Sequence, residues 1–134
     1  MRLVVDTGVF SAALSRRRRQ AFEVQVDLLS NNQLFLSVVT VAELRYGAMV
    51  AEWGDPRRAR VEAAIATTTV VPVTDALLTR IAATRAACRQ IGHPLADRLH
   101  SNDLWIAATA LHIDAAVVTA DRIFRGVPEL VVVP

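Results

Sequence analysis

The sequence has a single cysteine and no lysine, and all 15 of its basic residues are arginine. One cysteine, Cys88, excludes an internal disulfide, and nothing in the sequence requires an oxidising compartment. No charge-free apolar run approaches the roughly 18 residues that a membrane span requires. Asp6 interrupts the apolar N-terminal run, so we expect no secretory signal peptide, no membrane association and a cytoplasmic location.

The composition is that of one folded domain. A length of 134 residues is typical of a single domain, and 53% hydrophobic residues supply a full core. Disorder does not fit such a composition. No repeat, low-complexity segment or linker divides the chain, so we expect a single domain over residues 1–134.

Short apolar segments alternate with segments of helical periodicity along the whole chain. Continuous apolar strands are typical of a parallel sheet that is buried on both faces. The sequence therefore predicts an α/β fold, a three-layer α/β/α sandwich with a central parallel sheet. Pro72 favours an edge position for the third strand, because proline lacks the N–H of the ladder. The predicted strands are 2–5, 34–38, 70–73, 116–119 and 130–133. The predicted helices are 7–15, 20–30, 41–53, one that starts at 55–56, 75–91 and 103–113.

Four acidic residues are predicted to lie at one edge of this sheet. Asp6 directly follows the first strand, and Asp121 follows the fourth. Glu43 lies in the first turn of the helix after the second strand, and Asp103 begins the helix that leads into the fourth. The carboxyl ends of the strands and the N-termini of the helices share this edge, so the four carboxylates converge.

Each acid also has a purely structural interpretation. Asp6 can cap the following helix, and Glu43 can complete a capping box with Thr40. Asp103 can complement a helix dipole, and Asp121 can be a turn residue. Topology alone therefore leaves both interpretations open.

Four clustered carboxylates need a counter-charge. Two like charges about 5 Å apart repel by about 3 kcal/mol at an effective dielectric constant of about 20. Mg²⁺ and Mn²⁺ favour oxygen ligands and retain bound water. The metal acidifies such a water into a nucleophile and neutralises a phosphate oxygen. This is the chemistry of phosphodiester hydrolysis.

The rest of the chain is basic. Without the four proposed site residues, the 15 arginines exceed the nine remaining acids by six. Arginine pairs well with phosphate, so this charge suits a polyanionic substrate. It equally fits a basic protein with no such partner. The run Arg16–Arg19 can either contact RNA phosphates or form the solvated start of a helix.

Four motifs occur in order along the chain. They are Val4-Val5-Asp6-Thr7, Thr40-Val41-Ala42-Glu43-Leu44, Asn102-Asp103-Leu104-Trp105-Ile106-Ala107-Ala108-Thr109-Ala110 and Val118-Thr119-Ala120-Asp121-Arg122-x-Phe124. Together they resemble the PIN domain, and most closely the VapC toxins of bacterial VapBC toxin–antitoxin pairs. The resemblance covers essentially the whole chain.

The resemblance implies a Mg²⁺- or Mn²⁺-dependent endoribonuclease, the toxin of a type II toxin–antitoxin system. Such a toxin cleaves structured RNA, tRNA or rRNA, and so inhibits translation. The family implies a homodimer that a cognate VapB-type antitoxin silences.

Site roles follow from the same resemblance. It implies that the four acids are the catalytic and metal-binding residues, and that two hydroxyl side chains, Thr7 and Thr119, support them. At the position of Gly8 the family usually has a different residue. This difference bears on the fine geometry of the first loop and not on the activity. The residues that match the family's acidic positions are Asp6, Glu43, Asp103 and Asp121.

Other functions fit less well. Asp6-Thr7-Gly8 is also the aspartic-protease signature, but those sites lie in all-β folds. A phosphate-receiver domain typically uses a lysine, which this chain lacks. A haloacid-dehalogenase-type phosphatase has Asp-x-Asp after its first strand, where this chain has Asp6-Thr7-Gly8. There is no glycine-rich phosphate loop. The alternative that remains is a catalytically silent PIN-like module that binds RNA or a partner.

Several further residues have open interpretations. Asp97 is either an outer metal ligand or a solvated loop acid. His93, His100 and His112 lack metal-ligand spacing, so we assign none to catalysis. Cys88 lies on an apolar helical stripe, which predicts a core thiol.

The predicted helix 41–53 carries a second apolar stripe of Tyr46, Met49, Val50 and Trp53. This stripe is either part of the core or, where exposed, a surface for a protein partner such as the antitoxin.

Overall fold

The central strand β1 (Arg2–Val5) sets the architecture, because three of its four side chains are completely buried. The computed structural model describes residues 1–134, and in it β1 pairs in parallel with β2 on one side and β4 on the other. All four strand pairings are parallel, in the order β3-β2-β1-β4-β5. The remaining strands are β2 (Gln33–Leu36), β3 (Thr69–Val70), β4 (Ala116–Val118) and β5 (Val132–Val133).

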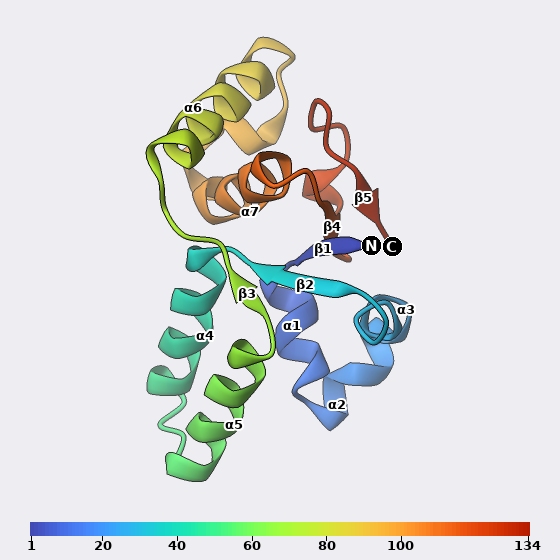
Figure 1. Ribbon diagram of the computed structural model, residues 1–134, viewed down its shortest axis with the longest axis vertical. Helices are drawn as coiled ribbons and strands as arrows, with labels where there is room; N and C mark the ends of the chain where they lie inside the picture. Colours follow the sequence, from blue (N-terminus) through green and yellow to red (C-terminus); the bar gives the residue numbers. More distant parts are fainter.

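Helices cover both faces of the sheet, with α1 to α5 on one side and α6 and α7 on the other (Figure 1). Successive side chains of β1 enter opposite cores: Leu3 and Val5 pack towards α1, α4 and α5, and Val4 packs towards α6 and α7. This confirms the predicted three-layer α/β/α sandwich with a parallel sheet. The main helices are α1 (Thr7–Ala13), α2 (Arg16–Arg19), α3 (Glu23–Asp27), α4 (Val38–Val50), α5 (Asp55–Ala66), α6 (Asp75–Gln90) and α7 (Ser101–His112).

The segment predicted as one helix over 20–30 is divided. The helix α2 leads through a 3-10 turn over Gln20–Phe22 into the short helix α3. All four arginines of α2 are exposed, as expected of a solvated helix start. None of the helices combines the length and the apolar character that a membrane span requires.

The start of α4 differs from the prediction. Ser37 is its N-cap, and the Ser37 hydroxyl accepts a hydrogen bond from the Val39 N–H at 3.3 Å. Thr40 therefore lies inside the helix, completely buried. The capping-box interpretation of Thr40 and Glu43 does not hold, because the hydroxyl that caps the helix belongs to the residue three positions earlier.

The two edge strands are shorter than predicted. β3 ends at Val70, before Pro72, and lies at one edge of the sheet as expected of a strand with a nearby proline. β5 begins at Val132 instead of residue 130. At the far end of α6, Gly92 has a φ of +70°, a backbone conformation that glycine adopts without steric cost and that ends the helix.

Candidate functional site

A pocket of about 430 Å³ opens where the four acids were expected to meet. They reach it from the end of β1, the first turn of α7, the second turn of α4 and the loop after β4. Parallel topology is the cause, because it places these strand ends and helix starts at one edge. The pocket is lined by Asp6, Thr7, Gly8, Phe22, Glu43, Asp103, Ala120 and Asp121.

Asp6 is the most enclosed of the four acids, with 8% of its surface exposed. Its Oδ2 accepts a hydrogen bond from the Thr119 hydroxyl at 2.7 Å. Its side chain makes no capping hydrogen bond to α1, so the capping interpretation does not hold. Burial raises the pKa of Asp6 above its ordinary value, and the charges of Asp121 and Glu43 add to the rise. The hydrogen bond from Thr119 partly offsets this rise.

Asp103 lies in the first turn of α7, with 28% of its side chain exposed. Burial, followed by the negative charges of the other three acids, raises the pKa of Asp103 to about 6. The His100 ring acts in the opposite direction, with Nδ1 3.9 Å from Asp103 Oδ2. A residue that only complemented the helix dipole would have a lowered pKa, since the positive end of the dipole favours the carboxylate. The surroundings of Asp103 therefore disfavour its charge overall.

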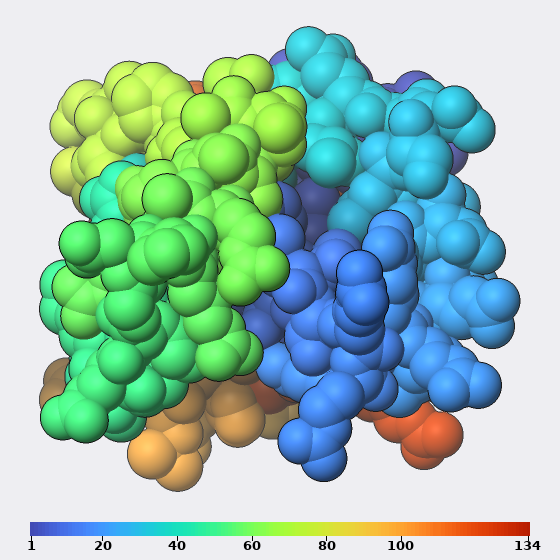
Figure 2. Space-filling view, turned by 90° about the horizontal axis from the view of Figure 1, so that it is seen from below, coloured from blue at the N-terminus to red at the C-terminus, as the bar shows by residue number.

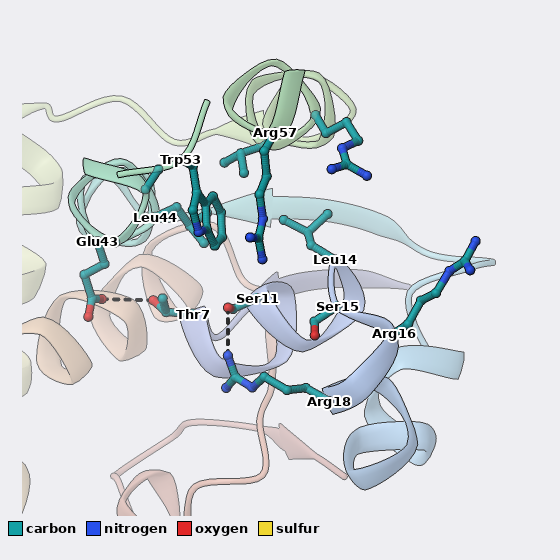
Figure 3. A pocket seen from close by; sticks show the side chains of 14 residues that line it. Thr7, Ser11, Leu14, Ser15, Arg16, Arg18, Glu43, Leu44, Trp53 and Arg57 are labelled. Carbon is teal, nitrogen blue, oxygen red and sulfur yellow. Dashed lines mark hydrogen bonds between the residues drawn. The ribbon is translucent and has the colours of Figure 1, made fainter. Parts of the chain in front are cut away.

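Glu43 is fixed by a contact between two helices. The Thr7 hydroxyl, at the start of α1, donates to Glu43 Oε1 at 2.9 Å (Figure 3). The Thr7 hydroxyl also lies 2.9 Å from the hydroxyl of Thr40, one turn before Glu43 on α4. Thr40 thus belongs to the support of this site. Sequence reasoning missed that role, although a polar residue one turn before a candidate acid is a visible signal.

Thr119 connects two of the acids. Besides donating to Asp6, its hydroxyl accepts a hydrogen bond from the Asp121 N–H at 3.0 Å. Asp121 Oδ1 accepts from the Ile123 N–H at 3.0 Å and caps the 3-10 turn Arg122–Phe124. The turn interpretation of Asp121 is therefore correct for one oxygen, while the residue also lines the pocket.

The donor set of the pocket consists of oxygen atoms, as hard cations prefer. No three acidic, histidine or cysteine side chains are close enough together to enclose a metal ion by themselves. Mg²⁺ is commonly held by one or two carboxylates and keeps several waters, so an open acidic pocket of this kind fits a hydrated ion. Burial and the neighbouring carboxylates raise the pKa of Asp103, so a cation in this pocket would favour its charged form.

The other candidates lie outside the pocket. Asp97 is exposed and caps a 3-10 turn by accepting from the Leu99 N–H at 2.9 Å, so it acts as a loop acid. His93 accepts from the Leu95 N–H at 3.0 Å, which makes it part of the structure of its loop. Cys88 is completely buried, and its prediction as a core thiol is confirmed.

A family comparison agrees with this geometry. The sequence matches the PIN domain model over residues 3–130, and the chain therefore belongs to the PIN domain family. It is 33% identical over 125 residues to Ribonuclease VapC5 of Mycobacterium tuberculosis, a match that covers 92% of this chain and 85% of that protein. The predicted resemblance to VapC-type PIN domains is thereby confirmed.

Solved structures show the same fold. FitAcB from Neisseria gonorrhoeae superposes with a TM-score of 0.80 at 25% identity, covering 98% of this chain and 96% of that chain. VapBC-5 from Mycobacterium tuberculosis, a member of the VapBC family of toxin–antitoxin systems, superposes with a TM-score of 0.65 at 29% identity. This match covers 98% of this chain and 95% of the VapBC-5 chain.

Proposed function

We propose that this chain is a Mg²⁺- or Mn²⁺-dependent endoribonuclease and the toxin of a type II toxin–antitoxin pair. The observation that carries the proposal is the convergence of Asp6, Glu43, Asp103 and Asp121 on one pocket. Membership of the PIN domain family and the likeness to a VapC ribonuclease support it.

The four carboxylates are the residues that would hold the cation, one or two of them directly and the others through its bound waters. When bound, it supplies an acidified water and neutralises a phosphate oxygen. The chain's own contribution is to orient the ligands: Thr119 fixes Oδ2 of Asp6, and Thr7 fixes Oε1 of Glu43. Because these hydroxyls hold the carboxylates in place, little reorganisation is needed when substrate binds.

The proposed substrate is structured RNA, with tRNA or rRNA as the cellular target in the cytoplasm. The excess of six arginines over the acids outside the site supports a polyanion. Mapping of RNA 5′ ends in cells after induced expression identifies the cleaved molecule. Enrichment of new ends in tRNA or rRNA is the expected result, and new ends confined to mRNA would contradict this part of the proposal.

We also propose two protein partners, a second copy of the chain and a cognate VapB-type antitoxin. The predicted apolar stripe is divided in the structure: Trp53 lies after the end of α4 and packs partly against the core, while Tyr46, Met49 and Val50 on α4 are 69%, 62% and 64% exposed. Three neighbouring exposed apolar side chains of this kind support a protein interface. We assign it to the homodimer.

The second candidate function is a PIN-like module that binds RNA without cutting it. All four acids are present and line the same pocket, which favours the enzyme. Cleavage of a labelled structured RNA with Mg²⁺, with Mn²⁺ and with a chelator separates the two functions. Metal-dependent cleavage supports the enzyme, and binding without cleavage under every condition supports the silent module.

Variants test the site itself. Asp6→Asn and Asp103→Asn should abolish metal-dependent cleavage while the circular dichroism spectrum stays native. Asp97→Asn is the matched control, because Asp97 is also a loop-proximal aspartate but lies outside the pocket. Full activity in both site variants would contradict the assignment, as would equal losses in all three.

A further inference from the structure

A second, larger hollow adjoins the acidic pocket. It has a volume of about 680 Å³ and lies between α1 and α2 on one side and α4 and α5 on the other. Figure 2 shows the molecule from the side on which these blue and green segments face each other across a depression. Thr7 and Glu43 line both hollows, so the basic groove, as we call the larger one, is continuous with the acidic pocket.

The charge of the groove is strongly positive. Four arginines line it, and Glu43 is the only acid among the 14 lining residues. None of the four forms an ion pair within the chain, whereas Arg45 and Arg80 do. The protein therefore leaves this charge free for a ligand. The four are Arg16, Arg18, Arg57 and Arg60.

Two of the guanidinium groups are held in place from opposite walls. Arg57 on α5 stacks on the Trp53 ring, with 3.8 Å between its central carbon and the ring centroid. Arg18 on α2 donates from Nη1 to the Ser11 hydroxyl at 3.0 Å. Figure 3 shows the guanidinium groups of Arg57 and Arg18 extending towards the groove, with Thr7 and Glu43 at the end that adjoins the acidic pocket. Guanidinium groups fixed in this way lose less freedom when they bind a phosphate.

The groove divides the arginine run of α2. Arg16 and Arg18 line it, whereas Arg17 and Arg19 are exposed elsewhere on the helix. One half of the run therefore lines the groove, and the other half is solvated away from it. Because the four residues share one helix, they provide a charge-matched comparison.

We propose that the basic groove binds the RNA strand beside the phosphodiester that is cleaved in the acidic pocket. Arg18 and Arg57 contact backbone phosphates from the two walls, and Trp53 is a positioning residue that holds Arg57. The inference rests on the proposed function for the identity of the polyanion. Four arginines against a single acid in the lining favour a polyanionic strand as the occupant of the groove.

The positive charge of the groove also offsets the repulsion between the acidic pocket and RNA. The acidic pocket repels a phosphodiester, and free cations along an adjoining groove offset this repulsion for the flanking phosphates. Their placement on both walls would hold a strand in a fixed path towards Glu43 and the other acids.

The test measures binding without cleavage. Fluorescence anisotropy with a short labelled single-stranded oligoribonucleotide, in the presence of a chelator, gives the Kd at salt concentrations from about 50 to about 200 mM. The groove variant is Arg16→Ala/Arg18→Ala, and the matched control is Arg17→Ala/Arg19→Ala. On α5, Arg57→Ala is compared with Arg58→Ala, whose side chain is exposed outside the groove.

Each lost phosphate contact should raise the Kd by roughly tenfold. It should also lower the slope of log Kd against log salt by about 0.7. We expect the Arg16/Arg18 double variant to lose about 0.7 in slope, because it removes the Arg18 contact, and the control to keep the parent slope. Arg57→Ala should weaken binding, and Trp53→Phe should weaken it less because a phenyl ring still supports the guanidinium.

Three outcomes would overturn the inference. Equal losses in the groove and control variants would mean that RNA senses only total charge. Unchanged RNA binding in the groove variants, with weakened binding of an acidic peptide, would assign the groove to a protein partner. Absence of RNA binding by the parent chain would also contradict it. Binding in the groove without any metal-dependent cleavage would instead leave the groove intact and contradict the proposed nuclease function.

Discussion

Removing the charge of Asp103 should stabilise the metal-free protein and abolish its activity. In the folded state, burial and three neighbouring carboxylates raise the pKa of Asp103 from 3.8 to about 6. A folded-state pKa above the unfolded value means that ionisation destabilises the native state. This penalty is absent below pH 3.8 and grows as the pH rises through both values.

The size of the effect follows from the pKa. The complete rise corresponds to about 3 kcal/mol of unfolding free energy, reached above pH 7, and about half of it is present near pH 5. Asp103→Asn removes the charge and should gain up to this amount, which is roughly 10 °C in Tm for a domain of this size. A residue whose only role was to begin a helix would instead lose up to about 1 kcal/mol.

Urea unfolding of the parent and of Asp103→Asn at about pH 5 and about pH 7.5, with a chelator, measures this difference. Asp97→Asn is the control, because asparagine keeps the oxygen that accepts from the Leu99 N–H, so stability should change little, and equally at both pH values. Added Mg²⁺ should stabilise the parent by mass action, by about 2.7 kcal/mol at a hundredfold excess over its Kd, and should stabilise Asp103→Asn less. Loss of stability in Asp103→Asn at both pH values, together with no metal effect on the parent, would refute the reasoning.

Three further predictions concern positioning and partners. Thr119→Val removes the hydrogen bond to Asp6, so it should raise the pKa of Asp6 further and reduce RNA cleavage. Thr119→Ser keeps the hydroxyl, so it should leave the pKa of Asp6 and the cleavage rate as in the parent. A carboxyl NMR titration and a cleavage assay check this, and equal effects of the two variants would argue for a packing role. Light scattering at micromolar concentration should give about twice the 14.6 kDa chain mass, and Met49→Glu should shift the protein to the monomer; a parent that stays monomeric counts against the dimer. Antitoxins of the family that the sequence resembles commonly place a C-terminal segment over the site, often with an arginine that neutralises the acids as a metal does. Deletion of that segment from the proposed antitoxin should therefore abolish inhibition, and inhibition by the truncated antitoxin would indicate another mode.

The alternation of strands and helices could be predicted because it depends on local periodicity. Val4 and Val117 lie in short apolar runs that are typical of a sheet buried on both faces, and the observed sheet is parallel throughout. Boundaries were predicted less well. Ser37 and Thr40 both follow the second strand, either hydroxyl can cap a helix, and the local sequence does not distinguish them.

The gathering of the four acids was also predictable, since it depends only on strand order and direction. The hydroxyl contacts that hold their carboxylates in place could not be predicted. The contacts of Thr7 with Thr40 and of Thr119 with Asp6 join residues 33 and 113 positions apart. No periodicity encodes such pairs, because they arise only where packed elements meet.

The sequence by itself determined the sandwich, the order of its elements and the edge at which its acids converge, because apolar periodicity and parallel topology are properties of pattern. Only the tertiary structure decided which of those acids is buried and which arginines are free. Asp6 and Asp121 each follow a strand, yet the first is almost fully enclosed and the second is exposed. Arg18 and Arg19 are neighbours, yet only Arg18 lines the basic groove. Burial and electrostatic environment depend on what packs around a side chain, and that is set by segments distant in the chain.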